Sequence, residues 1–501
     1  MGGYQSDVLI MVKIQLDKRT LVLIVLFFFA FFVRFIFINK GPFHYDTLDL
    51  ALSAQRTLDS LRLHYEHGTG YPLTVILGAF SIWTFRLFGI TDPVFCVNFM
   101  SVLAGAVGVL LLFFLVEKLF DFHKAMFSAI LLAVFPPHVA ISTFGKSLTL
   151  GICFALASAY YMYRYTEEDQ RNHLILSAVF LGFTAATRLS DCLVALPVVY
   201  LFLSSGRIDH ARMRSFVVFG FIALVTAGLY YLPLLFEKGF APWAMVLTQR
   251  QQAAFLGPFS DVSRAAFRWL LDQFWFNGSI LILVGFGFMF LKKQIRPFLF
   301  LLIWFLVFQL FYGSISSSGP RYLVIAWLPL VVAQGYFLGF LKKRIFYLAT
   351  AVVILMAMSD FLRYAPVLEF RHQRSLQAEY ARWISNRTSP DAVIMAIDEG
   401  IFIEHYAKRK VLYRPVTCDK VLLERFLDEK LDKLLEEGKK VYIIGTALSA
   451  YDPCHLFAKK LRERYELITI GKKANEDWHH ALLNREIITE WFFQIKKKGE
   501  R

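Results

Sequence analysis

Apolar stretches long enough to cross a lipid bilayer recur through the first 362 residues of this 501-residue chain. A helix needs about 20 apolar residues to span the hydrocarbon core, so a chain that repeats such runs is built for a membrane. Composition agrees, because 57% of the residues are hydrophobic and only 19% are charged, against roughly a quarter in soluble domains. The clearest runs are Leu21–Ile38, Val94–Val116, Ser215–Phe236, Pro297–Gly313, Tyr322–Leu341 and Ile345–Leu362.

The net charge of +15 is most simply explained by loops that fix the orientation of these helices. Basic residues concentrate in the cytoplasmic loops of multi-pass proteins, so the excess requires no nucleic-acid partner. One apolar segment, Tyr71–Phe88, decides the arrangement, since it contains Arg86 and begins at a Gly/Pro turn. If this segment lies in the membrane plane, the N-terminus and the later basic loops all fall on the cytoplasmic side. We therefore expect an in-plane or re-entrant segment that does not cross, in a plasma (inner) membrane protein.

The resulting fold class is a polytopic α-helical membrane protein with about 11 transmembrane helices. The loop at 39–93, the loop at 237–278 and the C-terminal region then share the external face, where we expect the chemistry. The expected spans lie near residues 20–38, 94–116, 125–141, 147–164, 174–187, 190–203, 215–236, 279–291, 297–313, 322–341 and 345–362.

From residue 365 onward, charged residues become frequent and long apolar runs cease. We expect a membrane module over 1–364 and a soluble extracytoplasmic α/β domain over 365–501. Cys418 and Cys454 share this second domain, and the sequence leaves open whether they pair. Its predicted helices are "SLQAEYARWISNRT" and "DKVLLERFLDEKLDKLLEEG", and its predicted strands are "AVIMAI", "KVYIIG" and "ELITIG".

The first external loop places an acid, Asp46, at the start of an amphipathic stretch, "TLDLALSAQRTLDSLRL". The stretch predicts a helix on the membrane surface. Two interpretations of Asp46 follow. It is either a helix cap, supported by Asp49 in the same first turn, or the acid of an active site.

Three stretches, in fixed order, resemble the GT-C superfamily of polyprenol-dependent glycosyltransferases. The likeness is to the group (glycosyltransferase family 39-like) that contains protein O-mannosyltransferases and lipid A aminoarabinose transferases. The first stretch is the external "YD", the surface helix and "GTGYPLTVILGAFSIWTFRLFG". The second and third match family helices at Thr187, Arg188 and Pro197, and at Arg321, Tyr322 and Pro329.

This resemblance implies an enzyme that moves one sugar from a polyprenyl-phosphate donor to an external lipid, glycan or protein acceptor. Asp46 matches the aspartate that, in the family, acts as a general base and takes the proton of the acceptor. The leaving phosphate needs cations, and the candidates are Arg188, Arg321, Lys146, Arg264 and Arg268. The candidates for acceptor contacts are His44, Tyr45, Asp49, His67, Tyr71 and Tyr322.

One departure from the family concerns the next external loop, where relatives commonly carry a second acid. The corresponding stretch here, "ISTFGKSLTLGICF", contains Lys146 and no acid. Asp46 then works either with this lysine or with a second acid from elsewhere, Asp49 or Asp191, and the sequence leaves that choice open. It assigns no metal ligands, and a role for a divalent metal stays unknown. Two alternatives remain open, a transporter or flippase of lipid-linked saccharides and a non-catalytic GT-C relative.

Overall fold

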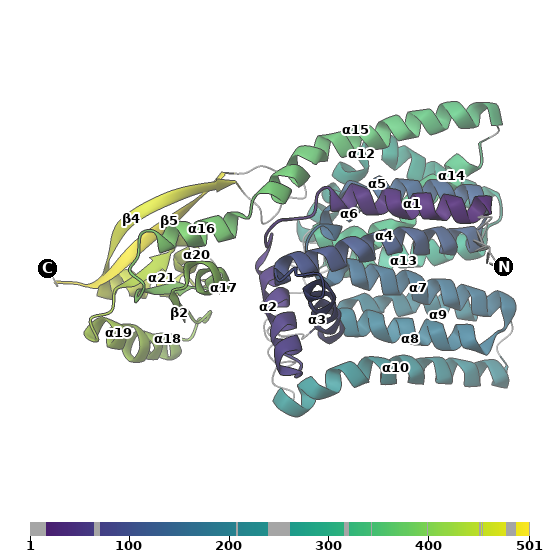
Figure 1. Ribbon diagram of the computed structural model, residues 1–501. Helices are drawn as coiled ribbons and strands as arrows, with labels where there is room; N and C mark the ends of the chain where they lie inside the picture. The colour runs from purple at the N-terminus through teal and green to yellow at the C-terminus, as the bar shows by residue number, and fades with distance from the viewer. Residues whose placement is uncertain are drawn as a thin grey trace, which may run out of the picture.

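The computed structural model describes residues 17–64, 71–206, 209–238, 261–314, 320–341, 343–397, 399–449, 452, 454–476 and 487–499. The chain forms a bundle of long helices and a smaller α/β part beside one end of it (Figure 1). Two further helices, α2 and α3, lie at that end of the bundle, between it and the α/β part. The helices of the bundle and its end are α1 (Lys18–Phe35), α2 (Tyr45–Ser60), α3 (Pro72–Arg86), α4 (Pro93–Leu119), α5 (Phe122–Val134), α6 (Pro136–Ser142), α7 (Ser147–Glu168), α8 (Arg171–Thr187), the 3₁₀ helix η1 (Leu189–Val194), α9 (Ala195–Leu203), α10 (His210–Lys238), α12 (Asp261–Leu291), α13 (Ile295–Gly313), α14 (Pro320–Gly339) and α15 (Lys343–Gln373).

Within the described residues, four helices are long and apolar enough to cross a membrane, namely α4, α10, α13 and α14. The bent pair α5–α6 makes a fifth if it counts as one span. A helix lies at each predicted span, while the count of about 11 crossings remains a prediction. Apolar helix α3 is shorter than these spans and packs against α2 and α4, and its in-plane placement also remains a prediction.

The predicted span 125–141 is not one straight helix, because α5 and α6 meet at a bend of 60°. Pro136 and Pro137 follow the bend and have no N–H to donate to the carbonyls of Leu132 and Ala133. The fully buried Arg34 supplies donors that the two prolines lack. Its Nη1 donates to Ala133 O (3.1 Å) and its Nη2 to Leu132 O (3.3 Å). An arginine inside an apolar helix thus closes the break between two others.

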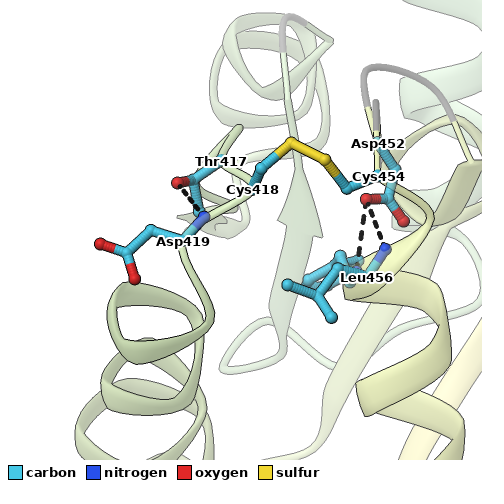
Figure 2. Close-up of a disulfide and its surroundings, with 7 residues drawn as sticks. Thr417, Cys418, Asp419, Asp452, Cys454 and Leu456 are labelled. Atoms are coloured by element: carbon cyan, nitrogen blue, oxygen red, sulfur yellow. Dashed lines mark hydrogen bonds between the residues drawn. A yellow bond between two sulfur atoms is a disulfide. The ribbon is translucent and has the colours of Figure 1, made fainter.

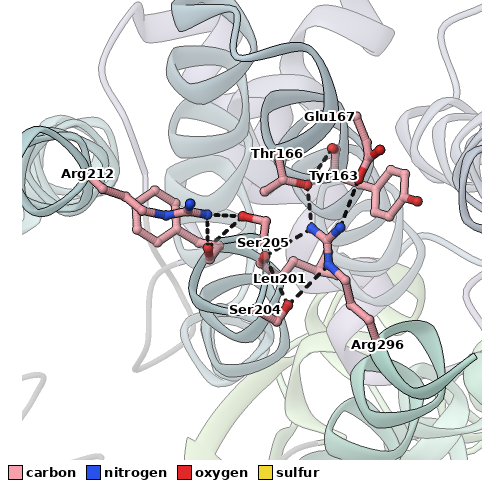
Figure 3. Close-up of polar contacts among 9 residues, drawn as sticks. Tyr163, Thr166, Glu167, Leu201, Ser204, Ser205, Arg212 and Arg296 are labelled. Carbon is pink, nitrogen blue, oxygen red and sulfur yellow. Dashed lines mark hydrogen bonds and ion pairs between the residues drawn. The ribbon is translucent and has the colours of Figure 1, made fainter. Parts of the chain in front are cut away.

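Basic residues tie helix ends together (Figure 3), and these ends lie away from α2 in the bundle (Figure 1). Arg296 at the start of α13 contacts Glu167 (2.8 Å) and Thr166 (2.6 Å) at the end of α7. Arg19 of α1 pairs with Glu117 of α4 (2.6 Å), and Arg212 of α10 donates to Ser205, which follows α9. The basic residues of these helix ends therefore gather at one end of the bundle, and the assignment of that end to the cytoplasm remains a prediction.

The C-terminal part is a mixed five-stranded sheet with helices packed on it. Its strand order is β2-β1-β3-β5-β4, in which β1 runs parallel to β2 and β3, and β5 runs antiparallel to β3 and β4. The elements are α16 (Leu376–Ser385), β1 (Val393–Ala396), α17 (Gly400–Phe402), the π-helix η2 (Ile403–Ala407), β2 (Lys410–Tyr413), α18 (Lys420–Phe426), the π-helix η3 (Leu427–Asp432), α19 (Lys433–Glu436), β3 (Val441–Ile444), α20 (Gly445–Ser449), α21 (Leu456–Arg464), β4 (Tyr465–Glu476) and β5 (Ile487–Lys497).

The predicted C-terminal α/β elements are confirmed. The strands β1, β3 and β4 fall on the three predicted strand segments, and α16 and α18–α19 fall on the two predicted helices. The division at residue 365 remains a prediction, and α15 carries the chain across that position without a break.

A disulfide resolves the question left open for Cys418 and Cys454, whose Cα atoms are 5.7 Å apart (Figure 2). It joins the turn before α18 to the turn before α21. Next to it, Asp452 accepts a hydrogen bond from the Leu456 N–H (3.1 Å) and so caps α21. The bridge closes a sequence separation of 36 residues and restricts the unfolded chain.

The α/β part shares a hydrophobic core with the helix that carries Asp46. Leu48 and Ala51 of α2, both fully buried, belong to the same cluster as Phe402 of α17 and the strands behind it. The C-terminal part thus rests on α2 and fixes its position at the end of the bundle.

Candidate functional site

Asp46 lies one residue inside α2, so it is not the helix cap. His44 occupies the cap position, and its Nδ1 accepts a hydrogen bond from the Asp46 N–H (3.3 Å). Burial lowers the pKa of His44 to about 3, which leaves its ring neutral and able to accept. The cap role predicted as one interpretation of Asp46 belongs to its neighbour. The Asp46 carboxylate is left to interact with residues from other helices.

One buried side chain, Asn98 of α4, aligns two loops that reach this carboxylate. Its Nδ2 donates to Asn39 O (2.8 Å), in the loop that leads to α2. Its Oδ1 accepts from the Gly145 N–H (2.6 Å), directly before Lys146. A Cβ at Gly145 would lie 2.9 Å from Val97 Cβ, so the loop approaches α4 this closely only because the residue is glycine. Asn98 therefore fixes the spacing between the loop before Asp46 and the loop before Lys146.

Lys146 forms a buried ion pair with Asp46 through Nζ and Oδ2. The two side chains are 6% and 11% exposed. Lys146 also occupies the N-cap position of α7 in an extended backbone conformation, and its side chain does not cap that helix but contacts Asp46 of α2. The lysine that stands where relatives carry an acid is thus the direct partner of the candidate base.

Three cations from three different parts of the chain surround the ring of Tyr322 at the start of α14. The Arg188 guanidinium lies 4.4 Å from the ring centroid, the Arg321 guanidinium 4.9 Å and the Lys146 Nζ 5.5 Å. Arg321 also donates to the Tyr322 hydroxyl (3.1 Å). Cations over the face of an aromatic ring are attracted by its negative face, which holds like charges together here. We call Lys146, Arg188, Arg321 and Tyr322 the cation cluster.

Arg188, which follows α8, also interacts with an acid, Asp191, which in turn bonds to a second tyrosine, Tyr312. Its Nε donates to Ser190 Oγ (3.1 Å) and lies 3.7 Å from Asp191 Oδ1. The hydroxyl of Tyr312 donates to the same Asp191 oxygen (2.9 Å), and its ring stacks on Tyr322 at 5.8 Å. Arg188 is 6% exposed, and its Nη1 has no hydrogen-bond partner in the part of the chain that the structure describes. A buried guanidinium N–H without an acceptor suits an anionic ligand.

The other acceptor candidates lie around this core. Asp49 follows Asp46 on α2, and burial together with the Asp46 charge raises its pKa to about 7. The ring of Tyr45 packs against that of His44, with centroids 4.6 Å apart and planes tilted by 38°. Tyr71 begins α3 with a positive φ of 41° and interacts electrostatically with Arg188.

Of the remaining candidates, two lie on α12 and one is not described. Arg264 and Arg268 are exposed on α12, and no described contact joins Arg268 to the cluster. His67 lies outside the described residues. Tyr312 and Asn98 were not predicted, although Tyr312 closes the last turn of a helix that the sequence places at the external face. Among the described residues, no group of three or more His, Cys, Asp or Glu side chains lies close enough to hold a metal ion.

Comparisons with known proteins place this site in a known fold. The family model for dolichyl-phosphate-mannose-protein mannosyltransferases matches residues 75–231. A comparison with curated protein sequences gives no match.

Several solved structures share the fold at low sequence identity. ArnT from Cupriavidus metallidurans bound to undecaprenyl phosphate has a TM-score of 0.63 and 14% identity over 94% of this chain and 97% of its own. The Archaeoglobus fulgidus oligosaccharyltransferase in complex with Zn and sulfate has a TM-score of 0.60 and 14% identity, with coverages of 89% and 71%. The arabinofuranosyltransferase AftD from Mycobacteria has a TM-score of 0.53 and 15% identity, with coverages of 95% and 42%. The predicted resemblance is confirmed, and the chain has the fold of the GT-C glycosyltransferases.

Proposed function

We propose that this chain is a membrane glycosyltransferase that moves a single sugar from a polyprenyl-phosphate donor to an acceptor on the external face. One observation carries the proposal: the carboxylate of Asp46 lies against a cluster of buried and partly buried cations around Tyr322. The cluster suits a phosphate, because charge-assisted hydrogen bonds from Lys and Arg stabilise the charge that develops as the sugar leaves. A structure with this fold holds undecaprenyl phosphate, which supports a polyprenyl carrier.

The chemistry follows from the placement of the two charges. Asp46 accepts the proton of the acceptor hydroxyl as its oxygen bonds to the anomeric carbon. The bond from that carbon to the phosphate oxygen breaks, and its electron pair stays on the polyprenyl phosphate. Lys146, Arg188 and Arg321 stabilise this leaving anion. A lipid, glycan or protein hydroxyl fits the acceptor position equally well by this chemistry.

Two observations support an external site. The disulfide between Cys418 and Cys454 belongs to an oxidising compartment, and the part that contains it packs on α2 beside Asp46. The basic helix ends, represented by Arg296, lie at the opposite end of the bundle.

The first experiment is to identify by mass spectrometry the lipid that co-purifies with the protein and to follow transfer of its sugar in native membranes. Asp46→Asn should lower transfer about 10²- to 10⁴-fold, the usual contribution of a general base. The matched control is Asp59→Asn, an acid on the exposed side of the same helix, which should transfer at the wild-type rate. Full activity of Asp46→Asn would show that another group is the base. Failure to bind any polyprenyl-phosphate lipid would exclude the donor class.

A further inference from the structure

The contact between Lys146 and Asp46 opposes the role proposed for Asp46. A carboxylate in direct contact with an ammonium group holds its negative charge tightly and is a weak proton acceptor. The pair is almost fully buried, so water screens it little. In the state that the structure describes, the candidate base is held by its neighbour.

The cation cluster carries more positive charge than its carboxylate partners neutralise. Asp191 pairs with Arg188, and Asp46 pairs with Lys146, while Arg321 adds a third cation over the same ring. The imbalance favours the arrival of an anion. The buried Nη1 of Arg188 gives that anion a donor that needs no other bond to break.

Lys146 is the member of the cluster best able to change partners. Its ammonium is a compact charge on a flexible stem, whereas the planar guanidinium groups of Arg188 and Arg321 lie over the ring of Tyr322, and Arg321 also donates to its hydroxyl. Nζ of Lys146 lies 5.5 Å from the centroid of the same ring, so it already borders the space that the two arginines share. A small rotation of its stem separates the ammonium from Asp46 and directs it to an anion beside Arg188.

We propose that Lys146 exchanges partners, from Asp46 to the phosphate of the donor, and that donor binding thereby frees Asp46 to act as a base. The proposal rests on the proposed function and adds its regulation. No covalent bond changes in the exchange, since one ion pair replaces another. The carboxylate gains proton affinity only while a phosphate occupies the cluster, and the ion pair forms again when the polyprenyl phosphate leaves.

The test measures the affinity of the full-length protein in nanodiscs for undecaprenyl phosphate, in four forms. These are the wild type, Asp46→Asn, Lys146→Met and the double variant. If binding must first break the ion pair, Asp46→Asn should bind about 5- to 20-fold more tightly than the wild type, since a coupling of this kind is worth about 1–2 kcal/mol. Lys146→Met should bind at least about 10-fold more weakly, which is about 1.4 kcal/mol.

The double variant separates an exchange from a simple change of charge. If the gain from Asp46→Asn acts through Lys146, it should fall below about twofold in the Lys146→Met background. Asp59→Asn, which alters an exposed acid of the same helix away from the cluster, is the matched control and should change affinity less than about twofold in either background. Lys146→Gln provides a second neutral form if Lys146→Met does not purify as a folded protein.

The outcomes keep the two proposals apart. Two results would overturn the exchange while leaving the cluster as the phosphate site. One is unchanged or weaker binding of undecaprenyl phosphate by Asp46→Asn. The other is a gain in affinity from Asp46→Asn that is as large in the Lys146→Met background as in the wild type. Absence of undecaprenyl phosphate binding in the wild type and in Asp46→Asn alike overturns the proposed function.

Discussion

Two of the regions that contain buried or partly buried basic side chains give their terminal N–H groups different partners. At the break between α5 and α6, both terminal nitrogens of Arg34 are bonded, to backbone carbonyls and to His138, and only its Nε has no hydrogen-bond partner among the described residues. Around Tyr322, the charged ends of Lys146, Arg188 and Arg321 meet rings and carboxylate side chains, and a terminal nitrogen of Arg188, Nη1, has no hydrogen-bond partner among the described residues. The first arrangement holds the chain together. The second is ready for an anion.

The largest effect expected from this comparison is on stability, from Arg34→Met. The variant leaves the carbonyl of Ala133, and part of the bonding of Leu132, unsatisfied in an apolar interior, at about 1–3 kcal/mol for each group. The apparent melting temperature of the purified protein should fall by several degrees. Arg19→Met is the matched control, because its exposed pair with Glu117 should contribute about 1 kcal/mol or less. If the two variants melt together, Arg34 does not close the helix break.

A second, smaller effect is expected from Arg321→Met, and it concerns ligand binding rather than stability. Loss of one charge-assisted hydrogen bond should weaken binding of undecaprenyl phosphate about 10-fold or more. The melting temperature should change by less than for Arg34→Met, since Arg321 is only partly buried. Arg268→Met, an exposed arginine on α12, is the control and should bind like the wild type. Equal losses from the two substitutions would contradict a localised phosphate site.

The smallest effect expected is a pH-dependent one at Asp49, beside the cluster. Burial and the charge of Asp46 raise the pKa of Asp49 from its ordinary value to about 7. The folded state therefore binds a proton that the unfolded state releases, so this residue's contribution to stability is lost as the pH rises through about 4 to 7. Asp49→Asn removes that loss. Its melting temperature should exceed the wild-type value by a few degrees at pH 8 and by less at pH 5.

The control for this prediction is Asp59→Asn, on the exposed side of the same helix. It should shift the melting temperature equally at pH 5 and pH 8. If the difference in melting temperature between Asp49→Asn and the wild type is the same at pH 5 and at pH 8, the pKa of Asp49 is not raised.

The sequence carries enough information to predict the helices and loops that contain the site residues, but not the contacts between those residues. Apolar runs and the amphipathic pattern after Asp46 are local signals, and the helices they predict are present. The lysine at position 146 is visible in the loop where relatives carry an acid. Its contact with Asp46 depends on two loops separated by 100 residues, and that spacing is set by Asn98 on a third element.

Two other features depend on tertiary contacts that no local pattern encodes. Tyr312 is one aromatic residue in a helix full of them, and only the fold brings its hydroxyl to Asp191. The consecutive prolines at Pro136 and Pro137 do signal a break in the span predicted at 125–141. What the sequence hides is that Arg34, about 100 residues earlier, bonds to the carbonyls that this break exposes.

The central claim is that the cation cluster around Tyr322 binds the phosphate of a polyprenyl donor beside Asp46. The most direct test is an experimental structure of the protein in nanodiscs with undecaprenyl phosphate. The phosphate should lie within hydrogen-bond distance, about 3 Å, of Arg188 Nη1 and Lys146 Nζ. A phosphate bound elsewhere, with the cluster left without an anion, would contradict the claim.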